Sequence, residues 1–237
     1  MKFDNLYLTK SKQQLEKDFQ NMFVSLGFQK GKSLQKMIRF ILKQYYDIPF
    51  HNIYHIYEVC KFVMYLFEKI PTNNIRDYKL IQNYKKLCFF AAICHDIGHK
   101  GVANKKAINK SNFWDISLNI EQDFIINDGS YNEKMHIQLT KDILKQYFKC
   151  FNISKDVNTT LFMNNVIIST DISLHTNIMS YINNLPIITT TEFIKNPITY
   201  SILILKLADL SHTLKPFKIH SNWVLKLKQE NKVNINS

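Results

Sequence analysis

The chain has 237 residues, and 46% of them are hydrophobic, so it can bury a core and is not a disordered segment. Only five glycines and five prolines are present, fewer than turn-dense β architectures need, and we therefore expect a mostly helical domain. The formal net charge is +12, but the lysines are scattered instead of forming one block, which argues against a nucleic-acid partner.

The sequence contains no segment that marks a membrane or secreted protein. No run approaches the ~20 apolar residues that a membrane-spanning helix needs, and the start "MKFDNLYLTKSKQQLEKDF" is too polar for a signal peptide. The four cysteines lack paired close spacing, which is typical of free thiols in a reducing compartment. We expect a cytoplasmic chain, with membrane association only through a longer parent chain, and the sequence leaves homo-oligomers open.

Three apolar patterns in the first half predict helices. Residues 34–45 carry an apolar stripe at helical spacing that stops before Pro49. Residues 52–70 repeat the pattern and stop before Pro71. The segment "LCFFAAICHD" is apolar nearly all round, so this third helix should be central in the bundle.

The second half continues the helical pattern. Residues 133–148 place apolar side chains on one face, and "KNPITYSILILKLADLSH" predicts a helix with Asn196 as N-cap and Pro197 in its first turn. The short β-branched run "VIISTDISLH" is compatible with a strand or with a buried helix. The polar stretches 100–132 and 176–195 should be loops with short helices.

Histidines and aspartates gather at the ends of these predicted helices. "FHNIYH" places His51 and His55 four residues apart, on one helical face. "HDIGH" ends the central helix, "TDISLH" pairs an aspartate with a histidine four residues later, and Asp209 closes an apolar helix. Buried carboxylates need compensation, which a divalent cation supplies to several at once. The set favours an open catalytic site for zinc, iron, manganese or magnesium that retains water.

The motifs "PFHNIYHIYEV", "HDIGHKGVAN", "INDGSYNEKMH", "TDISLH" and "ADLSHTLKP" resemble, in order and rough spacing, those of the class I cyclic nucleotide phosphodiesterases. These enzymes belong to the HD superfamily of helical, metal-dependent phosphohydrolases. The resemblance covers residues 34–223 and implies an all-α, multi-helix catalytic domain over 1–237, with the family's C-terminal helices missing. It also implies hydrolysis of cyclic AMP, cyclic GMP or both to nucleoside 5′-monophosphates in signal transduction.

The resemblance also assigns site residues by their match to the family's motifs. The ligands of a tightly held cation, for which zinc is expected, would be His55, His95, Asp96 and Asp209. Asp96 would also reach a second cation, Mg²⁺ or Mn²⁺. The positions that orient ligands or hold metal-bound waters would be His99, Glu133, Asp171 and His175. The proton donor to the leaving oxygen would be His51, because a histidine titrates near neutrality, and His212 would lie in the substrate pocket.

The sequence departs from the family pattern at several positions. Phe50, Glu58, Met135 and His212 replace residues that are usually tyrosine, aspartate, histidine and asparagine. After Trp223 the chain runs "KLKQENKVNINS", without the glutamine and aromatic clamp that hold the base in the family. The purine pocket should therefore be incomplete, with apolar surface exposed near Asp209 and the last helix.

Two other functions stay open at this point. The chain could hydrolyse a different phosphoester, as other HD proteins do. It could also be a degenerate relative that binds a metal or a partner without catalysis, a hypothesis that the early end favours and the intact ligand set opposes.

Overall fold

The structure is a computed structural model that describes residues 10–70, 78–104, 129–153 and 157–233. Every regular element in these ranges is a helix, and no strand occurs among the described residues, which confirms the all-α prediction. The α-helices are α1 (Lys12–Ser25), α2 (Lys32–Lys43), α3 (Ile53–Lys69), α4 (Tyr78–Cys94), α6 (Tyr131–Tyr147), α7 (Thr159–Ile168), α8 (His175–Ile182), α9 (Thr190–Lys195), α10 (Pro197–Asp209) and α11 (Phe217–Val233). The 3₁₀ helices are η4 (Phe148–Cys150), η5 (Ile172–Leu174) and η6 (Leu210–Leu214).

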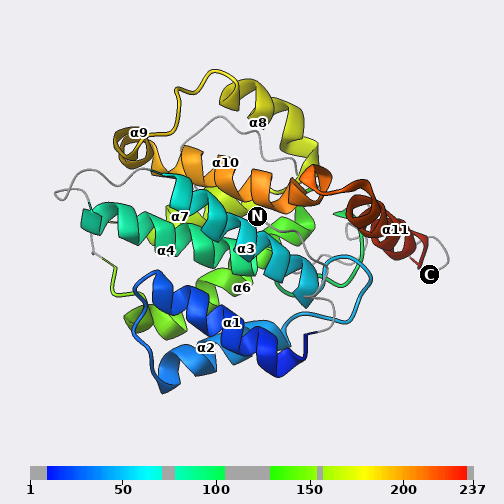
Figure 1. The fold of residues 1–237 in the computed structure, drawn as a ribbon, viewed down its shortest axis with the longest axis horizontal. Coiled ribbons are helices and arrows are strands. Elements are labelled where there is room, and N and C mark those ends of the chain that lie inside the picture. Colours follow the sequence, from blue (N-terminus) through cyan, green and yellow to red (C-terminus); the bar gives the residue numbers. More distant parts are fainter. Residues whose placement is uncertain (1–9, 71–77, 105–128, 154–156, 234–237) are drawn as a thin grey trace.

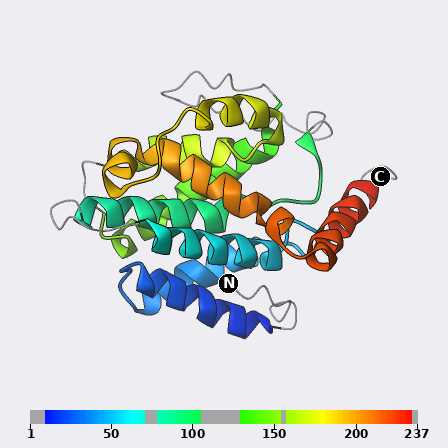
Figure 2. The same ribbon diagram turned by 45° about the horizontal axis from the view of Figure 1, so that its top comes forward.

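The centre of the bundle is formed by α3, α4, α7 and α10, which pack against one another (Figure 1). The pair α1 and α2 covers one side of this centre, and α8 and α9 lie on the opposite side (Figure 2). Helix α11 projects from one end and contacts η6, which follows α10 directly. This arrangement brings the C-terminal ends of α4 and α10 close to the N-terminal end of α3.

Helix α4 is the central helix that its sequence predicts, because every residue from Leu87 to Cys94 is buried. Two buried lysines precede this run, and each donates a hydrogen bond to a backbone carbonyl. Lys85 Nζ reaches Phe67 O at 3.2 Å, and Lys86 Nζ reaches Phe151 O at 2.9 Å. Burial lowers the pKa of both amines, and the carbonyl contacts compensate part of the cost of desolvation.

The helices expected at 34–45, 52–70, 133–148 and after Asn196 correspond to α2, α3, α6 and α10. Asn196 occupies the N-cap of α10, although its side chain makes no capping hydrogen bond. The ambiguous run "VIISTDISLH" is the buried end of α7 followed by η5, so the strand alternative is wrong. The sequence analysis did not predict α1 or α11, and residues 105–128 of the expected 100–132 loop lie outside the described residues.

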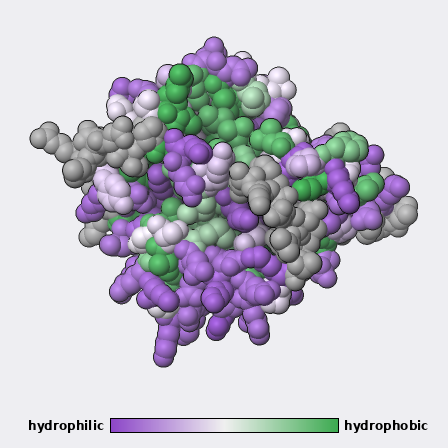
Figure 3. All heavy atoms as spheres, viewed as in Figure 1, coloured by the Kyte–Doolittle hydropathy of each residue, from purple (hydrophilic) through white to green (hydrophobic). Residues whose placement is uncertain are grey.

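Apolar side chains are exposed where α10 passes through η6 into α11. They are Leu207, Leu214, Phe217 and Leu225. Figure 3 shows apolar surface in this region, whereas the surface over α1 and α2 is mainly hydrophilic. This agrees with the expected exposure near Asp209 and the last helix. No helix in the described part of the chain is long and apolar enough to cross a membrane.

The turn after α4 depends on a glycine, which gives a test of the fold. Gly98 has φ +78°, and an added Cβ would lie 2.8 Å from Leu139 Cδ1 on α6. We expect Gly98→Ala to lower the free energy of unfolding by about 1–3 kcal/mol, because backbone strain and overpacking add. Urea denaturation measures this change.

Gly129→Ala is the matched control, since an added Cβ there meets no atom within 4 Å. It should change the free energy of unfolding by less than about 0.5 kcal/mol. Equal stability of Gly98→Ala and Gly129→Ala would show that the turn after α4 is not held as described.

Candidate functional site

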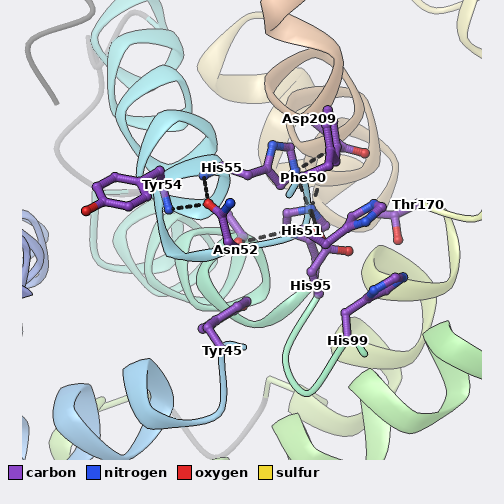
Figure 4. Close-up of polar contacts among 12 residues, drawn as sticks. Tyr45, Phe50, His51, Asn52, Tyr54, His55, His95, His99, Thr170 and Asp209 are labelled. Carbon is purple, nitrogen blue, oxygen red and sulfur yellow. Dashed lines mark hydrogen bonds and ion pairs between the residues drawn. The ribbon is translucent and has the colours of Figure 1, made fainter. Parts of the chain in front are cut away.

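The start of α3 positions two histidines on either side of a capping asparagine. The Asn52 side chain accepts hydrogen bonds from Tyr54 N at 2.9 Å and His55 N at 3.3 Å, which caps the helix (Figure 4). His51 therefore lies just before the helix, and His55 lies in its first turn with a nearly fully buried side chain. The cap fixes the direction of both imidazoles.

The end of α4 fixes the orientation of His95. Its Nδ1 lies 2.9 Å from the carbonyl oxygen of Ala92, which can only accept, so Nδ1 carries the proton. The lone pair of Nε2 therefore points away from the helix, toward Asp96 and Asp209. This is the arrangement of a metal-ligating histidine, whose second nitrogen is held by a carbonyl.

Four side-chain atoms from α3, the end of α4 and α10 come together at one point. His55 Nε2 lies 3.1 Å from Asp209 Oδ1 and 3.4 Å from Asp96 Oδ2. His95 Nε2 lies 3.2 Å from Asp96 Oδ2 and 3.5 Å from Asp209 Oδ1. Four ligands at about 2.0–2.2 Å from one cation, arranged tetrahedrally, are separated by about 3.4 Å. The four histidine–aspartate spacings match that geometry, and the ligand atoms of His55, His95 and Asp209 all lie within 4.8 Å of one another.

Three of the four atoms in this cluster have no other hydrogen-bond partner among the described residues. His55 Nε2, His95 Nε2 and Asp96 Oδ2 are buried and have no well-aligned hydrogen bond among the described residues. Burial opposes the charged forms, but the Asp96 and Asp209 carboxylates outweigh it and raise the pKa of His95 well above its usual value. Burial likewise opposes ionisation of Asp209, yet the two histidines hold its pKa below the usual range. A cation would satisfy all of these atoms at once, so the residues fit a divalent metal.

A second cluster joins His51 to the C-terminal helix. His51 Nδ1 lies 2.5 Å from Glu230 Oε1, and Glu230 Oε2 accepts from the backbone amides of Phe50 at 2.7 Å and His51 at 3.1 Å. The carboxylate can only accept, so Nδ1 of His51 carries a proton and Nε2 is the nitrogen left for the cavity. Burial raises the pKa of Glu230, but these donors outweigh burial and hold it below the usual value.

His99 supports His51 by stacking. The two rings lie 4.1 Å apart between centroids with an interplanar angle of 25°. His99 Nδ1 accepts from Gly101 N at 2.9 Å, which fixes the ring. Gly101 has φ +75°, and an added Cβ would lie 3.3 Å from Glu230 Cγ, so glycine permits the close approach of α11.

Both clusters open into one cavity of about 570 Å³. Its polar wall includes His51, Asp96, His99, Glu133, Asp171 and Asp209. Burial and the nearby Asp171 carboxylate raise the pKa of Glu133 to about 7. Asn104 Nδ2 donates to Glu133 Oε2 at 2.9 Å, and the Ser130 hydroxyl donates to Asp171. These carboxylates face the cavity with orientations set by hydrogen bonds.

The remaining predicted site residues lie in two places. His212 lies in η6 and lines the cavity, next to Phe50, whose ring centroid is 6.0 Å away. His175 begins α8 and is not among the described side chains that line the cavity. The structure therefore places seven of the predicted site residues in the cavity lining: His51, Asp96, His99, Glu133, Asp171, Asp209 and His212. His55 and His95 contact Asp96 and Asp209 but, like His175, are not among the described lining residues.

The sequence analysis missed Glu230. The glutamate lies in the lysine-rich segment "KLKQENKV" near the end of the given sequence. The signal was available, because Trp223, Leu227, Glu230 and Asn231 have the spacing of one helical face. Trp223 and Glu230 are buried, and Leu227 and Asn231 line the cavity.

Three of the unusual residues have clear contacts. Phe50 packs against His55 with 4.8 Å between ring centroids and against Trp223 at 5.5 Å. Glu58 forms an ion pair with Lys215, between α3 and the segment after η6. The position of Met135 on α6 lies over Gly98, since an added Cβ there would meet the Met135 side chain.

Comparison with known proteins agrees with this architecture. The family model described as 3′5′-cyclic nucleotide phosphodiesterase matches residues 50–234. The chain is 32% identical over 203 residues to a cGMP-specific 3′,5′-cyclic phosphodiesterase gamma of Plasmodium yoelii, covering 84% of this chain and 24% of that protein. It is also 32% identical over 200 residues to a dual 3′,5′-cyclic-AMP and -GMP phosphodiesterase beta of Plasmodium falciparum, covering 81% and 16%.

A solved structure shares the fold. The phosphodiesterase domain of the RhoPDE fusion protein from the choanoflagellate Salpingoeca rosetta superposes with a TM-score of 0.73 at 22% identity. The match covers 97% of this chain and 72% of that one, whereas the chain spans about a quarter or less of the two Plasmodium proteins. The match of the family model over most of the sequence shows that this chain belongs to the 3′,5′-cyclic nucleotide phosphodiesterase family.

Proposed function

We propose that this chain hydrolyses 3′,5′-cyclic nucleotides to nucleoside 5′-monophosphates with the help of two divalent cations. The observation that carries the proposal is the spacing of 3.1–3.5 Å among the facing atoms of His55, His95, Asp96 and Asp209, beside the His51–Glu230 pair. The names of the Plasmodium relatives, which act on cyclic GMP or on both cyclic nucleotides, support this substrate class.

His55, His95, Asp96 and Asp209 would hold the first cation, for which two imidazoles and two carboxylates suit zinc. Asp96 would also reach the second cation, Mg²⁺ or Mn²⁺, on the side of the cavity where Glu133 and Asp171 lie. When bound, such cations neutralise phosphoryl oxygens and lower the pKa of a water molecule that attacks phosphorus. The substrate's phosphodiester would therefore lie at the polar wall of the cavity.

The protein's own side chains would supply a proton donor to the leaving oxygen. Cleavage of the bond between phosphorus and the 3′ oxygen leaves an alkoxide, which is a poor leaving group without a proton. His51 lines the cavity, and Nε2, the ring nitrogen that Glu230 does not hold, would donate that proton. The stacked His99 ring limits rotation of His51, so the donor stays aligned.

Buried thiols support a cytoplasmic site of action. All four cysteines, Cys60, Cys88, Cys94 and Cys150, are free and buried. Free cysteines are typical of reducing compartments.

Turnover of cyclic AMP and cyclic GMP by the purified chain tests the proposal. We expect hydrolysis with added Mn²⁺ or Zn²⁺, complete loss after treatment with EDTA, and recovery when the metal is restored. A panel of other phosphoesters serves as the control. Hydrolysis of another phosphoester alone would favour a different HD enzyme, and metal binding without any turnover would favour a non-catalytic relative.

Metal content separates the two histidine roles. His95→Ala should lose bound metal and stability, because it leaves Asp96 and Asp209 uncompensated. His51→Ala should retain metal but hydrolyse about 10²–10⁴-fold more slowly, because a general acid contributes that much. Elemental analysis beside rate measurements checks both. If His51→Ala strips the metal or leaves the rate unchanged, the two roles are assigned wrongly.

Glu230→Gln tests how the carboxylate positions His51. The amide still fills the space, but it cannot accept from both backbone amides and from His51 Nδ1 at the same time. We expect kcat to fall on the order of 10–100-fold with unchanged metal content and a small change in KM. Glu68→Gln, the same change at an exposed residue on α3, is the control and should leave kcat unchanged. Loss of metal in Glu230→Gln would contradict a role limited to His51.

A further inference from the structure

A second pair of histidines includes His212, which lines the cavity. His212 Nδ1 lies 3.1 Å from His220 Nδ1, with a ring interplanar angle of 9° and centroids 5.2 Å apart. The centroids are farther apart than the nitrogens and the planes are nearly parallel, so the rings meet edge to edge through Nδ1. One Nδ1 must therefore donate a proton and the other must accept it.

The two histidines come from consecutive elements that approach each other. His212 lies in η6 and His220 in the first turn of α11, which packs against η6. Burial and then the neighbouring His220 lower the pKa of His212, so its ring is neutral at pH 7. His212 Nδ1 is occupied by His220, and Nε2 is the nitrogen that His212 retains for the cavity.

The hydrogen bond has two arrangements that differ in the position of its proton. If His220 Nδ1 donates, His212 Nδ1 accepts and His212 Nε2 carries a proton, so the cavity faces an N–H donor. If His212 Nδ1 donates, His212 Nε2 has a lone pair, and the cavity faces an acceptor. Both arrangements are neutral and keep the Nδ1···Nδ1 bond.

The chemistry of the cavity indicates which part of a nucleotide meets His212. The charged phosphodiester belongs with His51, Asp96 and Asp209 at the polar wall. The cavity is also lined by Phe50, Leu210, Leu227 and His212, which offer apolar and aromatic surface. A purine base is flat and carries both donors and acceptors on its edge, so it fits these side chains.

We propose that His220 is a positioning residue that holds His212 against the edge of the nucleotide base, with a proton arrangement that can present either a donor or an acceptor. The inference rests on the proposed function only for the identity of the ligand. It assigns a role to a residue of α11 that touches neither the phosphodiester nor a metal ligand. It also accounts for the edge-to-edge contact of two partly buried histidines beside the cavity.

Nitrogen NMR of the full chain with ¹⁵N-labelled histidine tests the pair without any ligand. We expect one protonated and one unprotonated Nδ1 in the pair, with His212 and His220 assigned through His212→Phe and His220→Phe. In His220→Phe, the remaining His212 signal should change toward that of a free imidazole, whereas His220→Asn should keep a bonded signal. Two unprotonated Nδ1 atoms in the wild-type chain would overturn the pair.

Calorimetric binding of 5′-AMP, 5′-GMP and ribose 5-phosphate tests the function of the pair. His220→Phe keeps a ring but removes the hydrogen bond. We expect it to raise the Kd of 5′-AMP and of 5′-GMP about tenfold and to leave the Kd of ribose 5-phosphate unchanged. His220→Asn retains a donor and an acceptor and should stay within about twofold of the wild type. Ser221→Ala, on the same helix, is the control for general effects.

The outcomes separate this inference from the proposed function. The role of His220 is overturned if His220→Phe binds 5′-AMP and 5′-GMP as tightly as the wild type does. It is also overturned if His220→Phe weakens the binding of ribose 5-phosphate by the same factor. Both conclusions hold even if the chain hydrolyses cyclic nucleotides. Selective weakening supports the role even if the chain does not turn over its ligand. A wild-type chain that binds no nucleotide overturns the inference as well.

Discussion

The structure depends on one constraint, the placement of two carboxylates in a buried position where helices end. Asp96 follows the buried end of α4, and Asp209 ends α10. Each would be costly there alone, because burial penalises its charge. The imidazoles of His55 and His95 face both carboxylates within 3.1–3.5 Å, and their shared centre fits a cation. Electrostatic attraction between the histidines and the carboxylates, as well as burial of apolar surface, therefore favours the convergence of α3, α4 and α10.

Helix α11 contacts His51, beside the cluster of His55, His95, Asp96 and Asp209. Its Glu230 does not join the four-atom cluster but binds the backbone and side chain of His51, which precedes α3. The Asn52 cap lies between His51 and His55, so the start of α3 carries both the imidazole proposed to bind metal and the imidazole proposed to donate a proton. Binding and proton transfer are thus assigned to neighbouring residues with different carboxylate partners.

Two of the four departures from the family pattern, Phe50 and His212, line the cavity. Phe50 contacts His55, His212 and Trp223, which links the base of α3 to η6 and α11. His212 is held by His220 from α11. The same helix therefore holds two histidines that line the cavity, His51 through Glu230 and His212 through His220. A change in the position of α11 would alter both contacts together.

The sequence by itself determined the helical class, the central position of α4 and the set of residues proposed to hold a metal. Apolar periodicity sets which face of a helix is buried, and a histidine or aspartate at a helix end is visible as a local pattern. It could not show that Glu230 meets His51 or that His220 meets His212, because those pairs depend on how α11 packs after η6. It also could not decide the state of "VIISTDISLH", which is short and apolar. Only packing against α6 and α10 makes this segment the end of α7. Contacts between distant segments are set by tertiary packing, because no local spacing encodes the angle at which two helices meet.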